Sequence, residues 1–199
     1  THTFEVFSAD NSTNKDPSPA SFNWTVDTIA PTTIINSAID GNNNTITNGS
    51  NTKSNAAMLE FSGNDTGVGI DHLECSLDGT SFSACTSPVQ FTSANLLDGT
   101  HSFMVIAQDK VGNIMTTPVL FNWTVDTLPP TTAINTAIDG NNGTLVSGNS
   151  TMSTSMAFTF SGNDRGIENN GVGIKQIECS IDNSNFTACV SPVEITPNI

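Results

Sequence analysis

One stretch of ten residues occurs twice in this sequence, and its two positions fix the length of a repeat. It reads FNWTVDTIAP at residues 22–31 and FNWTVDTLPP at residues 121–130, so the second copy begins 99 residues after the first. Phe, Trp and Val alternate with Asn and Thr, and this period of two is typical of a half-buried strand. The Pro that follows cannot donate a sheet hydrogen bond. The stretch therefore predicts the last strand of one module running into the first strand of the next.

Other matches extend the repeat over the whole chain. Residues 1–10 correspond to residues 100–109, and residues 38–41 correspond to residues 137–140, both with the offset of 99. The third copy is five residues longer in the loop at 165–170, so the offset becomes 104 at Cys179. Loops tolerate such insertions better than strands do. The predicted domains are residues 1–27, the last two strands of a module; residues 28–127, a complete module; and residues 128–199, a module that lacks its last two strands.

The complete module contains seven short stretches with strand-like alternation, separated by turn-rich loops. One polar loop follows Asp40 and another follows Phe61. Seven short strands in about 100 residues are typical of an immunoglobulin-like sandwich. The predicted fold class is therefore all-β, with tandem antiparallel immunoglobulin-like β-sandwiches that repeat about every 99 residues. The expected strands are residues 32–35, 57–61, 73–77, 82–85, 89–91, 100–107 and 119–125.

The four Cys fall at corresponding places in two repeats. Cys75 precedes Cys85 and Cys179 precedes Cys189 at the same spacing, with a strand, an Asp-Gly or Asp-Asn turn and a second strand between them. We expect a disulfide across each hairpin, which requires an oxidising compartment. Free or metal-bound thiols are the alternative, but no companion Cys or His lies at zinc spacing. The disulfides therefore predict an extracellular location.

The composition argues against several functional classes. The net charge is −14 with only five Lys plus Arg, whereas nucleic-acid binding needs clustered basic residues. No run of about 18 apolar residues is present, so we expect no membrane span in this segment. The sequence contains no P-loop, no nucleophile elbow and no HExxH motif. We therefore expect neither a nucleic-acid partner nor an enzymatic activity.

Five motifs of the central module form one pattern. They are ECSLDG at 74–79, CTSP at 85–88, GTHSF at 99–103, DKVGN at 109–113, and WTVDT at 123–127 with a double Pro after it. Together they resemble the tandem immunoglobulin-like repeats of bacterial and archaeal surface proteins. This resemblance implies an extracellular stalk, adhesin, filament or surface-layer component without catalytic residues. The first fragment departs from the pattern, because NSTN stands at 11–14 where KVGN stands at 110–113.

Calcium is the one metal hypothesis that the sequence supports. Calcium prefers six to eight oxygen ligands from carboxylates, Asn and backbone carbonyls. The alternative is that these residues only form turns, since turns use the same residue types without a metal. Lys175 also replaces one candidate in the third copy. Calcium therefore stays a hypothesis, with no other cofactor expected; its candidate ligands near the module boundaries are Asp65, Asp71, Asp109, Asn113 and Asp126.

Sequons for N-glycosylation are frequent in this Asn-rich chain. Asn23 and Asn122 are expected to point outward from the final strand of a module, where glycans would shield a sheet edge. The candidate sites are Asn11, Asn23, Asn43, Asn48, Asn64, Asn122, Asn142, Asn149 and Asn185.

The first and third parts are predicted to fit together. Residues 1–27 correspond to the two strands that the third copy lacks, so we expect that copy to present an open apolar face that includes Phe158, Phe160, Ile177 and Cys179. Such a face with unpaired strand edges favours association. We therefore expect a structural module of an extracellular filament or cell-surface array, which assembles head to tail with itself by strand donation or within one tandem polypeptide. The alternatives are an adhesin module that binds a ligand, a glycan or another cell-surface protein, and an accessory domain of a secreted enzyme.

Overall fold

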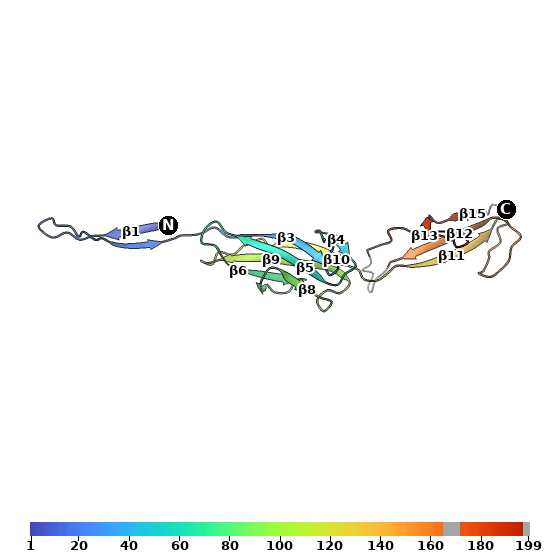
Figure 1. Ribbon diagram of the computed structural model, residues 1–199, viewed down its shortest axis with the longest axis horizontal. Helices are drawn as coiled ribbons and strands as arrows, with labels where there is room; N and C mark the ends of the chain where they lie inside the picture. The colour runs from blue at the N-terminus through green and yellow to red at the C-terminus, as the bar shows by residue number, and fades with distance from the viewer. Residues whose placement is uncertain (165–171, 197–199) are drawn as a thin grey trace.

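The computed structural model describes residues 1–164 and 172–196, and every regular element among them is a β-strand. This confirms the all-β prediction. Figure 1 shows three parts in a row along the longest axis: a hairpin with the N-terminus, a central pair of sheets, and a C-terminal group of strands. The described residues form no helix that is long and apolar enough to cross a membrane. The predicted loop insertion at residues 165–170 lies outside the described residues.

The central part consists of two sheets. One has the strand order β3–β5–β8, and the other has the order β4–β10–β9–β6–β7. Neighbouring strands are antiparallel, except that β4 and β10 run parallel. The strands are β3 (Thr32–Asp40), β4 (Ser50–Thr52), β5 (Ala57–Asn64), β6 (Ile70–Leu77), β7 (Ser83–Cys85), β8 (Val89–Phe91), β9 (Gly99–Asp109) and β10 (Val119–Val125).

Both sheets contribute to one hydrophobic core, an arrangement compatible with a β-sandwich. In β9 every second residue from His101 to Asp109 is buried, which follows from the period of two along a strand. β10 adds Trp123, which is 1% exposed, and β5 adds Leu59 from the facing sheet, which is fully buried. The apolar alternation of the sequence therefore marks the side of each strand that faces the core.

The structure contains one central strand that the sequence did not predict. β4 consists of Ser50, Asn51 and Thr52, a run without the apolar alternation on which strand prediction depends. It pairs with the end of β10, where Trp123 lies opposite Ser50 and Val125 lies opposite Thr52. The seven predicted strands are all present, and β3, β5, β6 and β9 extend beyond their predicted bounds.

The N-terminal hairpin has the same strand register as the hairpin of β9 and β10. β1 (His2–Val6) pairs with β2 (Ala20–Trp24), with His2 opposite Trp24 and Phe4 opposite Phe22. The corresponding pairs 99 residues later are His101 with Trp123 and Phe103 with Phe121. Every residue of β1 and β2 is exposed, whereas alternate counterparts in β9 and β10 are buried, namely His101, Phe103, Val105, Phe121 and Trp123.

The C-terminal part repeats the pairing of the smaller central sheet. Its main sheet has the order β11–β12–β15, and its β11–β12 register shifts between Ile134 and Thr136, just as β3–β5 shifts between Ile35 and Ser37. The second hairpin, of β13 and β14, is short. The strands are β11 (Thr131–Asp139), β12 (Met156–Asn163), β13 (Glu178–Cys179), β14 (Thr187–Ala188) and β15 (Val193–Ile195).

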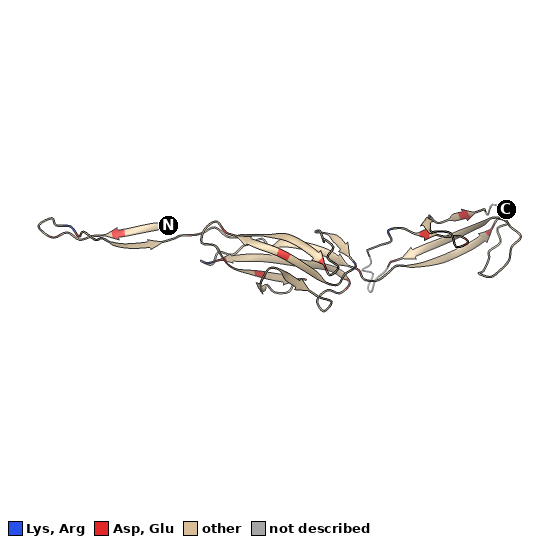
Figure 2. Ribbon diagram, in the orientation of Figure 1, with Lys and Arg blue, Asp and Glu red and all other residues tan. Residues whose placement is uncertain are grey.

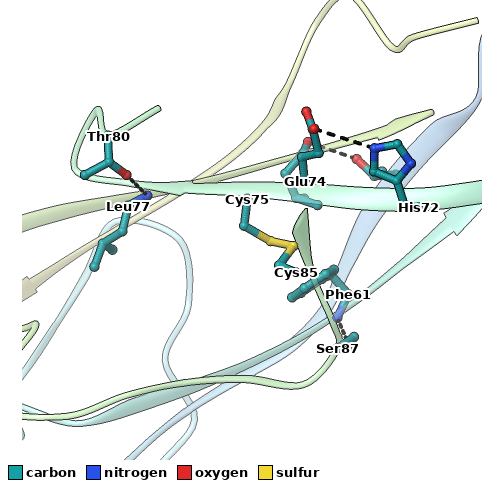
Figure 3. The surroundings of a disulfide bond; sticks show 10 residues. Phe61, His72, Glu74, Cys75, Leu77, Thr80, Cys85 and Ser87 are labelled. Carbon is teal, nitrogen blue, oxygen red and sulfur yellow. Dashed lines mark hydrogen bonds and ion pairs between the residues drawn. A yellow bond between two sulfur atoms is a disulfide. The ribbon is translucent and has the colours of Figure 1, made fainter. Parts of the chain in front are cut away.

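Both predicted disulfides are present. Cys75 bonds to Cys85 and Cys179 bonds to Cys189, each with a Cα–Cα distance of 5.8 Å. The first joins β6 to β7 across their hairpin and lies beside Phe61, whose backbone N–H donates to the Ser87 hydroxyl (Figure 3). No free cysteine occurs in the described residues. Two disulfides are consistent with an oxidising, extracellular environment.

Candidate functional site

The C-terminal part contains an open apolar groove of about 510 Å³ between its two short sheets. β11 and β12 line one side with Ile134, Phe158 and Phe160, and the segment around β13 lines the other side with Ile177 and Cys179. The phenylalanines and Ile177 are only half-buried, and Ile134 is 70% exposed. The open apolar face predicted from the sequence is therefore present.

The residues of this groove occupy the positions that form the core of the central part. Ile35, Leu59, Phe61, Leu73 and Cys75 correspond to those five lining residues. Leu59, Phe61 and Cys75 belong to the central hydrophobic cluster, and Ile35 and Leu73 pack against it. There the hairpin of β9 and β10 covers them. The ring of Phe103 lies 5.5 Å from that of Phe61 and 5.9 Å from that of Phe91, measured between centroids. The groove thus corresponds to the part of the central core that β9 and β10 cover.

The sheet edge beside the groove also differs from its central counterpart. β6 has eight residues and pairs with β9 over most of its length. The corresponding strand in the C-terminal part, β13, has two residues and pairs only with β14 among the described strands. β6 therefore has ladder hydrogen bonds on both sides, whereas β13 has them on one side only among the described strands.

A second candidate site lies where the N-terminal hairpin joins the central part. Carboxylate oxygens of Asp27, Asp65 and Asp109 lie within 4.8 Å of one another. Asp27 belongs to the linker after β2, Asp65 to the loop after β5, and Asp109 to the end of β9. Asn113 connects Asp27 to Asp109, because its side-chain amide donates to the Asp27 carbonyl at 3.1 Å and to Asp109 Oδ2 at 2.7 Å.

Backbone N–H groups hold most of these carboxylate oxygens. Asp27 Oδ2 accepts from Val68 N at 2.9 Å, and Asp65 Oδ2 accepts from Gly69 N at 2.6 Å. Asp65 Oδ1 is buried and accepts no hydrogen bond from any described residue. Burial favours the neutral form of Asp109, but hydrogen bonds from Asn113, Val111 and Gly112 outweigh it and lower the pKa of this carboxyl. The three carboxylates could therefore bind a hard cation such as calcium, which would give the buried Asp65 Oδ1 a partner.

The structure brings together only part of the predicted calcium set. Asp65, Asp109 and Asn113 meet at this junction. Asp71 Oδ2 instead lies 2.7 Å from His72 Nδ1 on the surface, and Glu74 lies near the other ring nitrogen of His72 (Figure 3). Asp71 therefore lies outside the cluster of Asp27, Asp65 and Asp109, and its role as a calcium ligand stays a prediction.

Asp126 lies at the next module boundary and holds there the place that Asp27 holds at the first. Its Oδ2 accepts from Val172 N at 3.0 Å, as that of Asp27 does from Val68 N. The sequence prediction missed Asp27, although the 99-residue repeat that pairs it with Asp126 was a sufficient signal. Figure 2 shows acidic residues in all three parts of the molecule.

Eight of the nine sequon asparagines are exposed, and Asn122 is half-buried. The backbone N–H of Asn122 donates to Asn48 Oδ1 at 2.7 Å, and the neighbouring Trp123 to Val125 segment pairs with β4. β4 therefore covers the edge of β10 beside Asn122, so a glycan at this residue would not shield an open edge, and Asn122 stays a glycosylation candidate. Asn23, its counterpart in β2, is exposed, as the sequence indicated.

No protein-family model matches this chain, and no curated protein matches it.

Proposed function

We propose that this chain is a structural repeat module of an extracellular filament or cell-surface array. Copies assemble head to tail, with the β1–β2 hairpin of one copy completing the C-terminal part of another. The copies are either separate subunits or segments of one longer polypeptide, and the contacts are the same in both cases. The strand orders β3–β5–β8 and β4–β10–β9–β6–β7 support immunoglobulin-like topology for each completed module.

One observation carries the proposal: the hairpin and the groove are the two halves of an arrangement that the central part contains whole. β1–β2 has the register of β9–β10, and the groove has the lining that β9–β10 covers. Docking would bury Phe4, Phe22 and Trp24, which are 58%, 67% and 42% exposed. Removing this apolar surface from water favours association at roughly 25 cal/mol per Å² before the cost of ordering the partners.

The main alternative is a module that binds a ligand or a glycan through exposed aromatic side chains. Phe22 and Trp24 are exposed here, but they correspond to Phe121 and Trp123, which are core residues of the central part. This correspondence supports a packing role for the exposed rings. An accessory domain of a secreted enzyme is a weaker alternative, since it does not account for two complementary ends.

Register-specific crosslinking tests the proposed assembly. In the central part Met104 pairs with Ser76, so the proposal places Glu5 of one copy opposite Ser180 of another. We expect the Glu5→Cys, Ser180→Cys double variant to form a ladder of disulfide-linked multimers in mild oxidant. A matched variant with Glu5→Cys and Val190→Cys should form no ladder, because Val190 lies outside the expected pairing.

Two results would contradict the proposal. One is a double variant that stays at monomer size under non-reducing conditions. The other is a crosslink within a single chain, which would mean that the hairpin folds back on its own C-terminal part.

A further inference from the structure

We propose that Asp182 fixes the incoming hairpin of a second copy by binding His2 and the backbone N–H of Thr3. This inference rests on the proposed head-to-tail assembly. The contact between Asp182 and β1 would set the register in which the apolar strands of the two copies pair.

The central part shows the complete contact. Asp78 lies in the turn between β6 and β7, and its Oδ1 accepts from Ser102 N at 2.8 Å. Its Oδ2 lies 2.8 Å from Nδ1 of His101, a side chain that is only 8% exposed. Asp78 N in turn donates to the Ser102 carbonyl at 2.8 Å. One turn residue thus makes three hydrogen bonds to the start of β9.

The C-terminal part contains the same turn. Asp182 has φ 51° where Asp78 has φ 52°, both in the left-handed region that most residues avoid. In each turn a hydroxyl accepts from the backbone at 3.2 Å, from Leu77 N to Thr80 and from Ile181 N to Ser184. The turn is therefore already formed in the absence of a partner strand.

The carboxylate of this second turn has no such contact within the chain. Asp182 is exposed, and none of residues 1–164 or 172–196 donates a hydrogen bond to its side chain. The residues that would complete the contact lie in β1. His2 and Thr3 correspond to His101 and Ser102, and His2 stacks on Trp24 at 5.2 Å as His101 packs beside Trp123 at 5.6 Å. The acceptor group therefore lies in the C-terminal part, and its proposed partners lie in the N-terminal hairpin.

The position of Asp182 suits it to select one register. A slip of one residue in β1 would remove His2 from Asp182, and it would turn Phe4 and Val6 away from the groove. The loss of the Asp182 contact and the loss of apolar burial therefore disfavour the same register slips.

A double-mutant cycle on the full chain tests this contact. Asp182→Asn removes the charge and keeps a residue that tolerates a positive φ. His2→Phe keeps an aromatic ring on Trp24 and removes the ring nitrogens. The dissociation constant of each junction is measured from the concentration dependence of sedimentation velocity for the wild type, both single variants and the double variant. Asp78→Asn is the matched control, since it makes the same change in a turn whose partner strand is in the same chain.

We expect Asp182→Asn and His2→Phe each to weaken association roughly tenfold. The double variant should associate about as weakly as either single variant. Asp78→Asn should leave the association constant unchanged. The contact would be overturned, and the assembly left intact, if the wild type associates but Asp182→Asn has no effect. The same holds if the effects of the two substitutions on the association constant multiply independently. A wild-type chain that stays monomeric at all concentrations would overturn the assembly itself.

Discussion

Aspartates at the ends of strands accept hydrogen bonds from the loops that follow and so stabilise these loops. Asp40 is 5% exposed and accepts from Asn42 N at 2.8 Å, Asn44 N at 2.9 Å and the Thr52 hydroxyl at 2.8 Å. Burial favours its neutral form, but the hydrogen bonds from Asn44, Thr52 and Asn42 outweigh it and lower its pKa. Asp139 occupies the same place in the C-terminal part, where the Thr151 hydroxyl and Gly143 N lower its pKa.

These carboxylates predict a loss of stability in acid. A carboxyl whose pKa is lower in the folded chain than in the unfolded chain stabilises the fold at pH values above the unfolded pKa, about 3.9 for Asp. That contribution disappears as the pH falls through the folded pKa. We expect the thermal midpoint of the full chain to be level near neutral pH and to fall below about pH 4. Circular dichroism melts from pH 7 downward measure it.

Asp40→Asn provides the control for the acid prediction. It should lower the midpoint at pH 7, by a free energy of about 2 kcal/mol if the charged acceptor is lost, and should reduce the further loss in acid. A wild-type midpoint that rises on acidification would contradict the role assigned to these groups.

At the scale of strands and hairpins, local sequence pattern accounts for most of what could be predicted. Seven central strands have apolar alternation and flanking turns, so their existence follows from the sequence. β4 does not, because Ser50, Asn51 and Thr52 carry no apolar signal and the strand forms only by pairing with β10. A pairing between segments more than 70 residues apart depends on the tertiary fold, which local pattern does not encode.

The acidic junction shows the same limit. Asp65 and Asp109 could be named from loops rich in Asp, Asn and Gly, but their convergence with Asp27 depends on how the linker crosses the loop after β5. Asp71 lies close to Asp65 in sequence, yet it sits at the start of β6 and pairs with His72. Proximity in sequence was therefore a poor guide to proximity in space at this boundary.

The hairpin disulfides give a prediction for single elements. Replacing both Cys75 and Cys85 by Ala removes a crosslink that closes a loop of 10 residues in sequence separation. We expect a loss of about 3 kcal/mol in unfolding free energy, because the unfolded chain gains conformational freedom. Denaturant unfolding of this variant and of wild type measures the difference. A loss well below 1 kcal/mol would show that β6 and β7 hold together without the crosslink.

Calcium binding is a prediction for the junction of linker, loop and strand end. The buried, unpartnered Oδ1 of Asp65 beside two further carboxylates is the observation that favours it. A ligand that binds only the folded chain raises its stability. We expect about 1 mM calcium to raise the thermal midpoint of the wild type, and chelator to reverse the effect.

Two variants separate a site from general screening of negative charge. Asp65→Asn should abolish the calcium-dependent rise, whereas Asp71→Asn, which removes the same charge on the nearby surface, should retain it. An equal rise in both variants, or none in the wild type, would contradict binding at this junction.

For the whole molecule, the linkers decide whether modules hold a fixed arrangement. Asp27 bonds to Val68 N in the part that follows it, and Asp126 bonds to Val172 N in the next. Each linker is therefore hydrogen-bonded to a loop of the part that follows it. Pro129 and Pro130 further restrict the backbone conformation of the second linker. We therefore expect the proposed array to be stiff and extended rather than freely jointed.

The proposed head-to-tail assembly makes a last prediction about growth. A chain without residues 1–24 keeps its groove and can accept a hairpin, but it has no hairpin to donate. Each such chain should therefore end a filament at one side, because every junction needs one donor and one acceptor. We expect the mean filament length to fall as the truncated chain is mixed with full chain in rising proportion, measured by electron microscopy and light scattering. As a matched control, full-length Leu97→Ala, which alters an exposed side chain outside both ends, should not shorten filaments. Truncated chain that polymerises alone, or that leaves filament length unchanged in the mixture, would show that the hairpin does not carry the junction.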